Sequence, residues 1–462
     1  MGAFHAYDIR GIYNVDFNRE TAYKVGFFLP ELLATDKVLV GRDARVSSPE
    51  IHHWLIEGIT DAGADVVDLG LTTTPMVYFA TANYGYKASV QITASHNPKE
   101  YNGMKVSTTN ALPVGLDSGL GTIQQWIEQG RACIPVQENG GSKGKVETLD
   151  ILPAYKEFMS RYVSDFSGLK VAVDLSNGMS ALAIKDILAG TGAQFSYICD
   201  TIDGTFPNHE ANPLIAENIV MLQKEVARTG ADLGMIYDGD ADRVMFTDEN
   251  GRFISPDLVI ALMGRYWFGM RGFNGPGPER NVSVLQDIRS SKAVGEYLQQ
   301  WGAQIHTWKV GRAFAAKKLR EINGLFGGEL AGHYYFKEFF YSDSGILASL
   351  IVLNIVSSLH RDGVRLSQAI AEIETYRNSG EINFKLEAKQ EAMDEVKRVF
   401  SSEENPEVIM DFDGYRLEFP HWWFNIRPSN TEPYLRFICE ADTQELLDEK
   451  VARARSIIES FK

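Results

Sequence analysis

The chain has 462 residues, more than the roughly 100–200 residues of a typical domain, so we expect three or four domains. Hydrophobic residues make up 44% of the sequence and charged residues 23%, as in soluble globular proteins. The 61 acidic residues outnumber the 45 basic ones, and the net charge of −16 disfavours binding to nucleic acid or to an anionic membrane. A small anionic substrate stays compatible with this charge wherever positive groups cluster locally.

The cysteines and the apolar segments indicate the compartment. Cys133, Cys199 and Cys439 lie far apart without metal-type spacing, so we interpret them as buried thiols in a reducing compartment and assign them no chemical role. The first residues, MGAFHAYDIRG, lack the pattern of a secretory signal. The most apolar segment, 345–359, contains Asn354 and is shorter than the roughly 20 residues of a membrane span, which favours a buried helix. We therefore expect a cytoplasmic protein.

A short β-rich run, a polar turn and a helical pattern follow one another three times along the chain. The runs are 37–40, 169–173 and 282–285. This is the repeating unit of an α/β sheet, and its return at wide intervals indicates three related α/β domains. The helical patterns begin at Glu50, Ser180 and Lys292.

The C-terminal stretch has a different pattern, which indicates a fourth, α+β domain. Four predicted strands cover 381–386, 414–419, 422–426 and 434–440, and a closing helix covers 443–460. The clearest loop-like breaks are 140–144 and 275–278. We place the four domains at 1–145, 146–255, 256–368 and 369–462.

Residues 93–105, TASHNPKEYNGMK, directly follow the apolar run 88–92, which is typical of a buried strand. A turn at Asn97-Pro98 would be enough to end that strand. The segment presents a serine, a histidine and two asparagines as well, and this concentration of polar groups indicates chemistry rather than a simple connection.

Three carboxylates, Asp238, Asp240 and Asp242, alternate along the turn after the predicted strand 233–237. A tight turn that contains glycine brings these positions together, so the carboxylates can converge on one hard cation. The segment does not match the glycine and glutamate positions of a calcium-binding EF-hand loop. A solvated acidic turn is the alternative, but Arg243 alone would not neutralise three closely packed carboxylates. The pattern favours a divalent metal site.

A glycine-rich segment, 327–333, contains Glu329 and His333. A carboxylate accepts paired hydrogen bonds from vicinal hydroxyls, so this segment is typical of a polyol-binding loop. A structural turn with a packing histidine is the alternative interpretation.

A fourth polar segment, 427–433, begins with Arg427. Arginine binds phosphate through two hydrogen bonds, and Ser429, Asn430 and Thr431 could complete an anion-binding loop. A plain turn between two prolines is an equally good interpretation of this segment alone.

Taken in order, the segments TASHNP, DGDADR, GGELAGH and RPSNTEP resemble the alpha-D-phosphohexomutase family, together with AYDIRG near the start. One signature falls in each predicted domain, and the resemblance covers essentially the whole chain. Within the family the chain looks most like the phosphoglucomutase/phosphomannomutase branch. The resemblance implies three related α/β domains and a C-terminal α+β domain around a central cleft, in the order phosphoserine, metal-binding, sugar-binding and phosphate-binding domain.

The resemblance also implies residue roles. Ser95 would be the phosphoserine that donates and recovers a phosphoryl group, with His96 in the same loop and Lys105 reaching towards the transferring phosphate. Arg10 joins this catalytic group and, with Tyr7, would line the opposite side of the cleft. Mg²⁺ would be held by the three alternating aspartates and a phosphate oxygen on the serine. The remaining substrate-binding residues would be Arg243, Arg289, Arg312, Glu329, His333, Arg427, Ser429, Asn430 and Thr431.

Three positions depart from the family pattern. Ala331 stands where serine is common, Arg312 where histidine is frequent and Arg289 where lysine is frequent. Arginine cannot act as a base at neutral pH, so we interpret both arginines as phosphate ligands. The general base stays open between Lys105 and His333.

The implied reaction interconverts hexose 1-phosphate and hexose 6-phosphate, with glucose or mannose as the hexose. A hexose 1,6-bisphosphate would be the intermediate and activator, and the sequence leaves the oligomeric state open. One alternative is phosphoglucosamine mutase, although such relatives usually have Glu-Gln-Ser where this chain has Glu329-Leu330-Ala331. Another is a non-catalytic protein that binds sugar phosphates, which would need neither the serine nor the metal.

Overall fold

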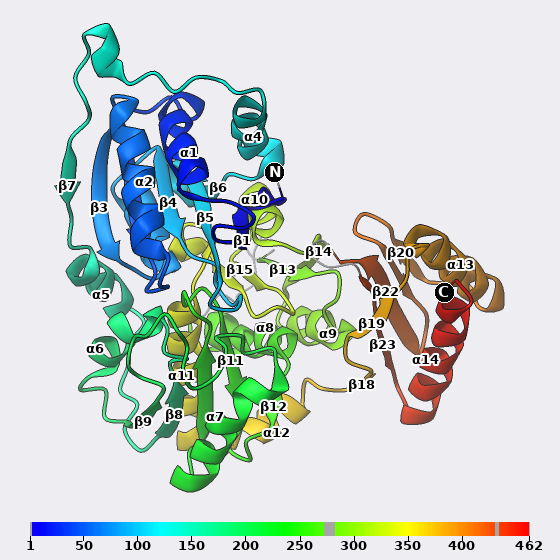
Figure 1. The fold of residues 1–462 in the computed structure, drawn as a ribbon. Coiled ribbons are helices and arrows are strands. Elements are labelled where there is room, and N and C mark those ends of the chain that lie inside the picture. Colours follow the sequence, from blue (N-terminus) through cyan, green and yellow to red (C-terminus); the bar gives the residue numbers. More distant parts are fainter. Residues whose placement is uncertain (1, 272–281, 430–433, 462) are drawn as a thin grey trace.

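The computed structural model describes residues 2–271, 282–429 and 434–461. Within these ranges the chain forms four β-sheets, each from its own stretch of sequence. Figure 1 shows the first unit above the second and third, with the C-terminal unit projecting to one side. Three mixed α/β sheets and a separate antiparallel sheet confirm the predicted fold class.

The first unit places residues 93–100 in the turn between two antiparallel strands. Gln91 lies opposite Lys105 across these strands, so the lysine stands next to the turn. Residues 146–148 pair with the same sheet, which therefore extends past residue 145. In sheet order, the strands are β1 (Ile9–Ile12), β5 (Tyr101–Thr108), β4 (Ala88–Ile92), β2 (Lys37–Arg42), β3 (Asp65–Leu71) and β7 (Val146–Thr148), with β6 (Leu112–Pro113) beside β5. The helices are α1 (Arg19–Leu32), α2 (Ser48–Asp61), α3 (Thr74–Asn83) and α4 (Leu120–Glu128).

The second unit carries the three alternating aspartates in a corresponding turn. The strand 233–237 pairs in parallel with the strand 170–174 and antiparallel with the strand 244–247. Residues 238–243 connect the two antiparallel strands. In sheet order, the strands are β12 (Phe253–Ile254), β11 (Val244–Thr247), β10 (Leu233–Tyr237), β8 (Lys170–Asp174) and β9 (Gln194–Ile198). The helices are α5 (Leu152–Ser160), α6 (Ile184–Leu188) and α7 (Ala216–Thr229).

The third unit repeats this arrangement, with residues 329–333 in the hairpin turn. Each of the first three sheets thus presents its polar turn between a strand of the parallel part and that strand's antiparallel neighbour. In sheet order, the strands are β14 (Gln304–Trp308), β13 (Ser283–Asp287), β15 (Phe326–Gly328), β16 (Tyr334–Phe336) and β17 (Ser342–Asp343). The helices are α8 (Pro256–Gly264), α9 (Lys292–Gln300), α10 (Arg312–Glu321), α11 (Gly345–Arg361) and α12 (Leu366–Ala371).

The C-terminal unit is an antiparallel sheet with two helices. The four predicted strands and the closing helix are present, and a further helix, α13 (Lys389–Glu403), precedes β20 (Val408–Met410). The other strands are β18 (Arg377–Asn378), β19 (Ile382–Lys385), β21 (Tyr415–Glu418), β22 (Trp422–Pro428) and β23 (Tyr434–Ala441), and the closing helix is α14 (Gln444–Glu459).

The buried hydrophobic residues form several clusters, and the first unit has one of its own in addition to the one that it shares. One cluster of buried residues runs through the first three units. In that cluster the ring of Tyr155, from α5, lies 5.7 Å from Phe79 of α3 and 6.5 Å from Phe339 of the third unit. The C-terminal unit has a cluster of its own. Its contacts with the third unit include hydrogen bonds from the buried Arg416 to the carbonyl oxygen of Ser290, at 2.6 Å, and to that of Ile288.

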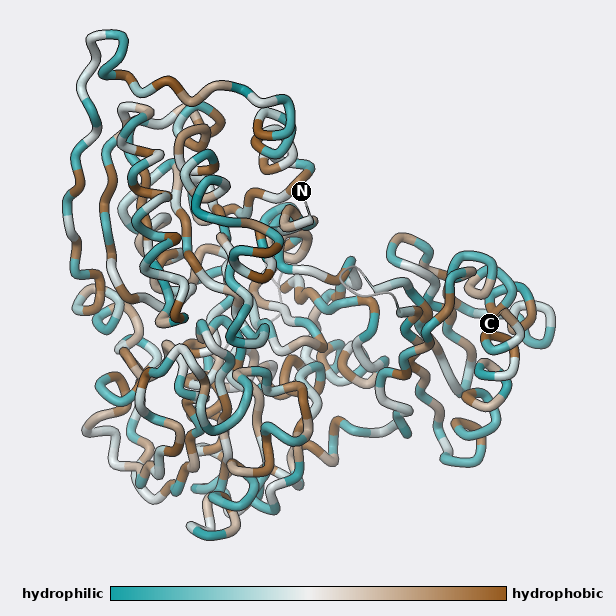
Figure 2. The backbone as a smooth tube through the Cα atoms, in the orientation of Figure 1, coloured by the Kyte–Doolittle hydropathy of each residue, from teal (hydrophilic) through white to brown (hydrophobic). Residues whose placement is uncertain are grey.

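The apolar segment 345–359 forms most of the buried helix α11, as predicted. Asn354 is satisfied inside it, because its side-chain amide donates to the carbonyl oxygens of Tyr162 at 2.8 Å and Leu350 at 2.7 Å. Within the described ranges, each helix is too short or too polar to cross a membrane. Figure 2 shows polar and apolar stretches alternating along the helices, as expected for helices that rest one face on a sheet.

Candidate active site

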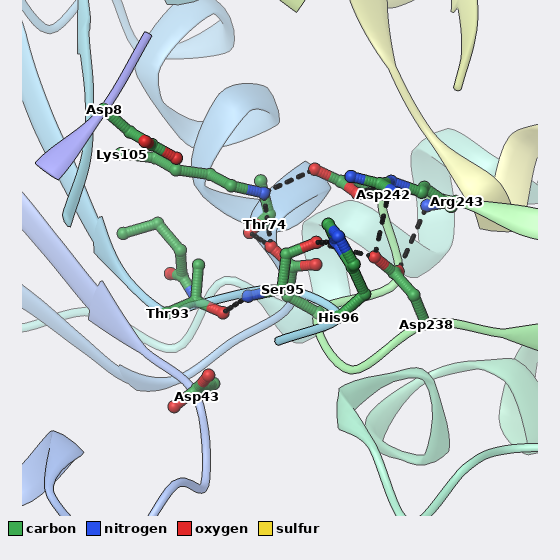
Figure 3. Close-up of polar contacts among 12 residues, drawn as sticks. Asp8, Asp43, Thr74, Thr93, Ser95, His96, Lys105, Asp238, Asp242 and Arg243 are labelled. Carbon is green, nitrogen blue, oxygen red and sulfur yellow. Dashed lines mark hydrogen bonds and ion pairs between the residues drawn. The ribbon is translucent and has the colours of Figure 1, made fainter. Parts of the chain in front are cut away.

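The turns of the first and second units meet at one place, which Figure 3 shows in close-up. The Ser95 hydroxyl donates to Asp238 Oδ2 at 2.8 Å. The Lys105 ammonium donates to Asp240 Oδ2 and Asp242 Oδ2, both at 2.6 Å. A predicted nucleophile, a predicted cation and three predicted metal ligands are therefore in direct contact.

Ser95 is held in an uncommon backbone conformation. Its φ of +52° lies in the left-handed region, and the residue is fully buried. Its N–H donates to the Thr93 hydroxyl at 2.9 Å. A Cβ atom at Gly239 would lie 2.5 Å from the Ser95 carbonyl oxygen, so the aspartate turn can approach this closely only with glycine there. Backbone strain of this kind clusters at functional sites.

Arg45 organises the serine turn, and the sequence analysis missed it. This arginine is buried and lies 3.2 Å from Asp43 in an ion pair. The segment GRDARVSS contains both residues. An arginine two residues after an aspartate, in the turn after a buried strand, is the signal that could have drawn attention to it. Arg45 donates, at 2.7 to 3.0 Å, to the backbone carbonyls of Ser95, Asn97, Pro98 and Tyr101.

The three aspartates form a compact group of oxygen donors. Asp238, Asp240 and Asp242 are fully buried, and one carboxylate oxygen of each lies within 4.8 Å of the others. Thr74 donates a hydrogen bond to Asp240. The Oδ1 atoms of Asp240 and Asp242 are buried and find no hydrogen-bond donor among the described residues. Unpaired carboxylate oxygens in a buried site are what a hard divalent cation requires.

The electrostatics of this group depend on nearby cations. Burial raises the pKa of Asp238 well above its ordinary value, and the neighbouring Asp240 and Asp242 raise it further. Burial also disfavours the charge of Asp242, but Lys105 and His333 outweigh it and hold the pKa of this carboxyl below its ordinary value. The cluster therefore carries its full negative charge only where enough positive charge faces it.

His96 and Arg243 flank the serine and the aspartates. His96 Nδ1 lies 3.3 Å from the Ser95 hydroxyl, and burial together with nearby cations lowers the pKa of this imidazole well below its usual range. The Arg243 guanidinium lies 3.7 Å from Asp238, and its backbone pairs with that of His333. This last pairing joins the second turn to the third.

Arg10 and Tyr7 approach from the first unit. Arg10 donates to the side-chain oxygen of Asn97 at 2.8 Å and pairs with Asp8 at 2.5 Å. Burial alone would lower the pKa of Arg10, but Asp8 outweighs it and the pKa is raised. The Tyr7 hydroxyl donates to the Val310 carbonyl at 3.1 Å, so Tyr7 links the first and third units.

The predicted sugar loop is buried and well supported. Glu329 Oε1 accepts from the Gly311 N–H and the Tyr335 hydroxyl, both at 3.1 Å, and burial raises the pKa of this carboxyl. His333 Nδ1 lies 2.6 Å from Asp343 Oδ2. The sequence analysis missed Asp343, an acidic residue in the polar segment just before the apolar helix.

Arg312 and Arg289 have different surroundings. Arg312 Nε donates to Asp343 at 3.0 Å, the guanidinium lies 3.8 Å from the centre of the Tyr78 ring, and its Nη2 finds no partner among the described residues. Arg289 makes two side-chain hydrogen bonds to Asp287, at 2.7 and 3.2 Å. Asp287 thus engages two of the five N–H groups of Arg289, and Glu381 lies 3.6 Å from its Nη1. Arg312 keeps its buried Nη2 available for an anion.

The C-terminal unit contributes Arg427, whose Nε donates to Asp413 at 3.2 Å and whose Nη2 finds no partner among the residues that the structure describes. Asp413 also accepts from the Val310 N–H at 2.8 Å, which ties this unit to the third. Ser429 directly follows β22. The other two predicted phosphate ligands, which lie outside the described residues, are Asn430 and Thr431.

Comparisons with known proteins agree with this arrangement. Four domain families of phosphoglucomutase/phosphomannomutase match the chain in order: alpha/beta/alpha domains I, II and III at residues 1–131, 154–251 and 255–376, and the C-terminal domain at 381–456. The phosphomannomutase of Methanocaldococcus jannaschii is 33% identical over 98% of this chain and 97% of its own. The chain belongs to the phosphoglucomutase/phosphomannomutase family. This confirms the alpha-D-phosphohexomutase membership predicted from the four signatures.

Other members of the family are similar over nearly their whole length. A protein of Xanthomonas campestris pv. campestris (strain B100) named phosphohexose mutases is 34% identical over 95% of both chains. The crystal structure of a family protein from Burkholderia thailandensis superposes with a TM-score of 0.86 at 26% identity, over 99% of this chain and 97% of that one. As a member of this family, the chain is a phosphohexomutase, an isomerase of the intramolecular phosphotransferase class.

We predict that Arg45→Met loosens the serine turn. The substitution removes the donor for four carbonyls and leaves Asp43 buried without its partner, and breaking a buried ion pair costs about 3–5 kcal/mol. Hydrogen exchange followed by mass spectrometry should show faster exchange in a peptide covering residues 95–101. The half-buried Arg42 is the matched control, and Arg42→Met should leave that peptide unchanged. A lower melting temperature with unchanged exchange in this peptide would show that Arg45 supports only overall stability.

Proposed function

We propose that the chain interconverts the 1-phosphate and 6-phosphate of glucose and of mannose, with Ser95 as the carrier of the phosphoryl group. The observation that carries this proposal is the hydrogen bond from the Ser95 hydroxyl to Asp238, inside a buried carboxylate cluster that Lys105 also contacts. A protein that only binds sugar phosphates needs neither the hydroxyl nor the cluster. This contact therefore favours catalysis.

The residues fit a resident Mg²⁺. The cluster offers only carboxylate oxygens, and two of these are buried without a donor among the described residues. Asp238, Asp240 and Asp242 would hold the ion, with a phosphate oxygen on Ser95 as a further ligand. When bound, the ion would neutralise charge on the phosphoryl oxygens.

The phosphoryl group passes from Ser95 to a hydroxyl of the substrate. The bond between phosphorus and Ser95 Oγ breaks, a hydroxyl of the substrate attacks the phosphorus, and a base accepts the proton of that hydroxyl. The resulting hexose 1,6-bisphosphate turns round, its other phosphate returns to Ser95 Oγ, and the base gives its proton to the sugar oxygen that leaves. Lys105 contacts the same carboxylate cluster as Ser95 and would face the transferring phosphate. Holding the substrate in line makes the step effectively unimolecular.

The two candidate bases differ in their surroundings. Lys105 is hydrogen-bonded to Asp240 and Asp242, and its role as a cation beside the phosphate uses its protonated form. His333 is held through Nδ1 by Asp343, which leaves Nε2 to exchange a proton. We therefore favour His333 as the general base.

The phosphate that is not transferred needs its own ligands. We propose Arg427, together with Ser429, Asn430 and Thr431, because the last three follow Arg427 closely in the sequence and the Nη2 of Arg427 has no partner among the described residues. Arg312 is a second candidate, since its Nη2 lacks a partner among the described residues. We further propose a cytoplasmic location, which suits three free cysteines.

A coupled assay against glucose, mannose and glucosamine 1-phosphates tests this function. Glu329 can accept from the 3- and 4-hydroxyls, which nearly keep their places when the sugar turns round, and Ala331 adds no polar group aimed at C2. Discrimination at C2 should then be about 1–3 kcal/mol, so glucose and mannose should differ in kcat/KM by no more than roughly two orders of magnitude. Glu329→Gln should reduce both rates to a similar degree.

The outcomes of this assay are distinct. Preference for glucosamine 1-phosphate would support the alternative function of a phosphoglucosamine mutase. Absence of turnover with all three sugars, at full folding and with Mg²⁺ present, would favour a binding protein. Use of one hexose without its C2 epimer would mean that another residue recognises C2.

We predict that Ser95→Ala lowers kcat by roughly 10³-fold or more, because it removes the atom that carries the phosphoryl group. Phosphopeptide mapping of the purified wild-type protein should locate a partial phosphoryl modification on Ser95. Ser107 of β5 is the matched control, since its buried hydroxyl has no hydrogen-bond partner among the described residues. Ser107→Ala should keep both activity and modification. A phosphate mapped elsewhere, with an active Ser95→Ala variant, would contradict the mechanism.

We predict that EDTA abolishes turnover and that Mg²⁺ restores it, because the carboxylate cluster prefers a hard cation. Asp238→Asn keeps the shape of the side chain and should reduce kcat by at least about 10²-fold, by the usual size of lost electrostatic stabilisation. Its melting temperature, measured in parallel, should change little. Full activity after exhaustive dialysis against EDTA would exclude a resident metal.

A further inference from the structure

A second group of metal-type ligands lies in the second unit, apart from the catalytic cluster. Asp174 is the last residue of β8, Cys199 directly follows β9, and His209 lies in the connection between β9 and α7. One ligand atom of each side chain lies within 4.8 Å of the other two. The three positions are distant in sequence, which explains why cysteine spacing gave no sign of a metal site.

The histidine faces two acceptors. His209 Nδ1 lies 2.8 Å from the Glu210 carbonyl oxygen, and its Nε2 lies 3.1 Å from Asp174 Oδ2. If Nδ1 donates to the carbonyl, Nε2 can face a carboxylate oxygen only when a second proton or a cation lies between them. Two ligands of a tetrahedral zinc ion stand about 3.3 Å apart, from Zn–N and Zn–O bonds of about 2.0–2.1 Å, so the observed spacing fits a shared ion.

The supporting contacts orient the ligands. The Ser176 N–H donates to Asp174 Oδ1 at 2.8 Å, which leaves Oδ2 directed at the histidine. The Asn177 N–H donates to the Cys199 carbonyl oxygen at 2.8 Å and holds the β9 end next to the β8 turn. A carbonyl on the far nitrogen of the histidine and a fixed carboxylate are the usual outer contacts of a protein metal site.

We propose that Asp174, Cys199 and His209 bind a thiophilic divalent transition metal, of which Zn²⁺ is the best example. The set combines nitrogen, oxygen and sulfur, which suits zinc, whereas the oxygen-only catalytic cluster suits Mg²⁺. Binding replaces the thiol proton of Cys199 with the metal and releases that proton. Three protein ligands leave one position of a tetrahedral ion for water.

The proposed metal site is connected to the turn of Ser95 through Arg45. The connection that carries His209 also carries Phe206, whose ring centre lies 5.0 Å from the Arg45 guanidinium. The backbone of Gly204 pairs with that of Arg45. Since Arg45 holds the turn of Ser95, a metal that fixes this connection also steadies the surface on which that turn rests.

Cobalt substitution tests the proposal on the intact protein. Co²⁺ is added to metal-free protein in excess Mg²⁺, which fills the oxygen-only site, and a thiolate-to-cobalt charge-transfer band is followed in the near ultraviolet. We expect the band to saturate at one equivalent in the wild type and to be absent in Cys199→Ser. Cys133→Ser is the matched control and should keep the band.

A zinc titration against a chromogenic chelator gives an independent result. His209→Gln should weaken Zn²⁺ binding by at least about tenfold relative to wild type. Circular dichroism and melting curves without metal establish whether each variant is folded. If Cys199→Ser does not fold, the zinc affinity of His209→Gln tests the proposal. The proposal is wrong if the wild type shows no band, if the band survives in folded Cys199→Ser, or if His209→Gln binds Zn²⁺ as tightly as wild type.

Discussion

Three carboxylates buried within 4.8 Å of one another create a repulsion that the rest of the structure has to balance. Lys105 supplies positive charge from the first unit, and the His333 ring approaches Asp242 from the third, at 3.8 Å. Removing Lys105 leaves unbalanced buried charge on the carboxylates, which costs several kcal/mol. The relative placement of the first three units is therefore an electrostatic requirement as well as a matter of packing.

A hairpin of the same kind occurs in each of the first three sheets. In each of these sheets, the polar turn connects a strand of the parallel part to its antiparallel neighbour. The three turns carry the proposed nucleophile, the proposed metal ligands and the proposed sugar-binding residues. The turns occupy corresponding places but differ in length and in residue type, since they cover 93–100, 238–243 and 329–333. Gly239 in the second turn allows the backbone of the first turn to approach, which a side chain would prevent.

The sequence identified those features whose parts are close together along the chain. The alternating aspartates lie within a few residues of one another, as do the residues from Ser95 to Lys105, so the pattern was enough to predict that each group forms one polar site. Arg45 was missed because the carbonyls that it holds begin 50 residues later, and no property of an isolated arginine reveals them. Asp343 was missed for the same reason, since its partner His333 is recognised only when the third sheet is folded.

The division of the hydrophobic cores has a mechanical consequence. The first three units share one cluster, so moving any of them would open apolar surface to water, which is expensive over any useful distance. The C-terminal unit has its own cluster and meets the third unit partly through Arg416, Asp413 and the Ser291–Glu440 hydrogen bond. Water can replace polar contacts of this kind one at a time, at little net cost for each. Separating the C-terminal unit from the third would therefore break polar contacts of this kind and the stacking of Trp308 on Phe412, whose ring centres lie 5.3 Å apart. Separating the first three units would instead expose a shared core.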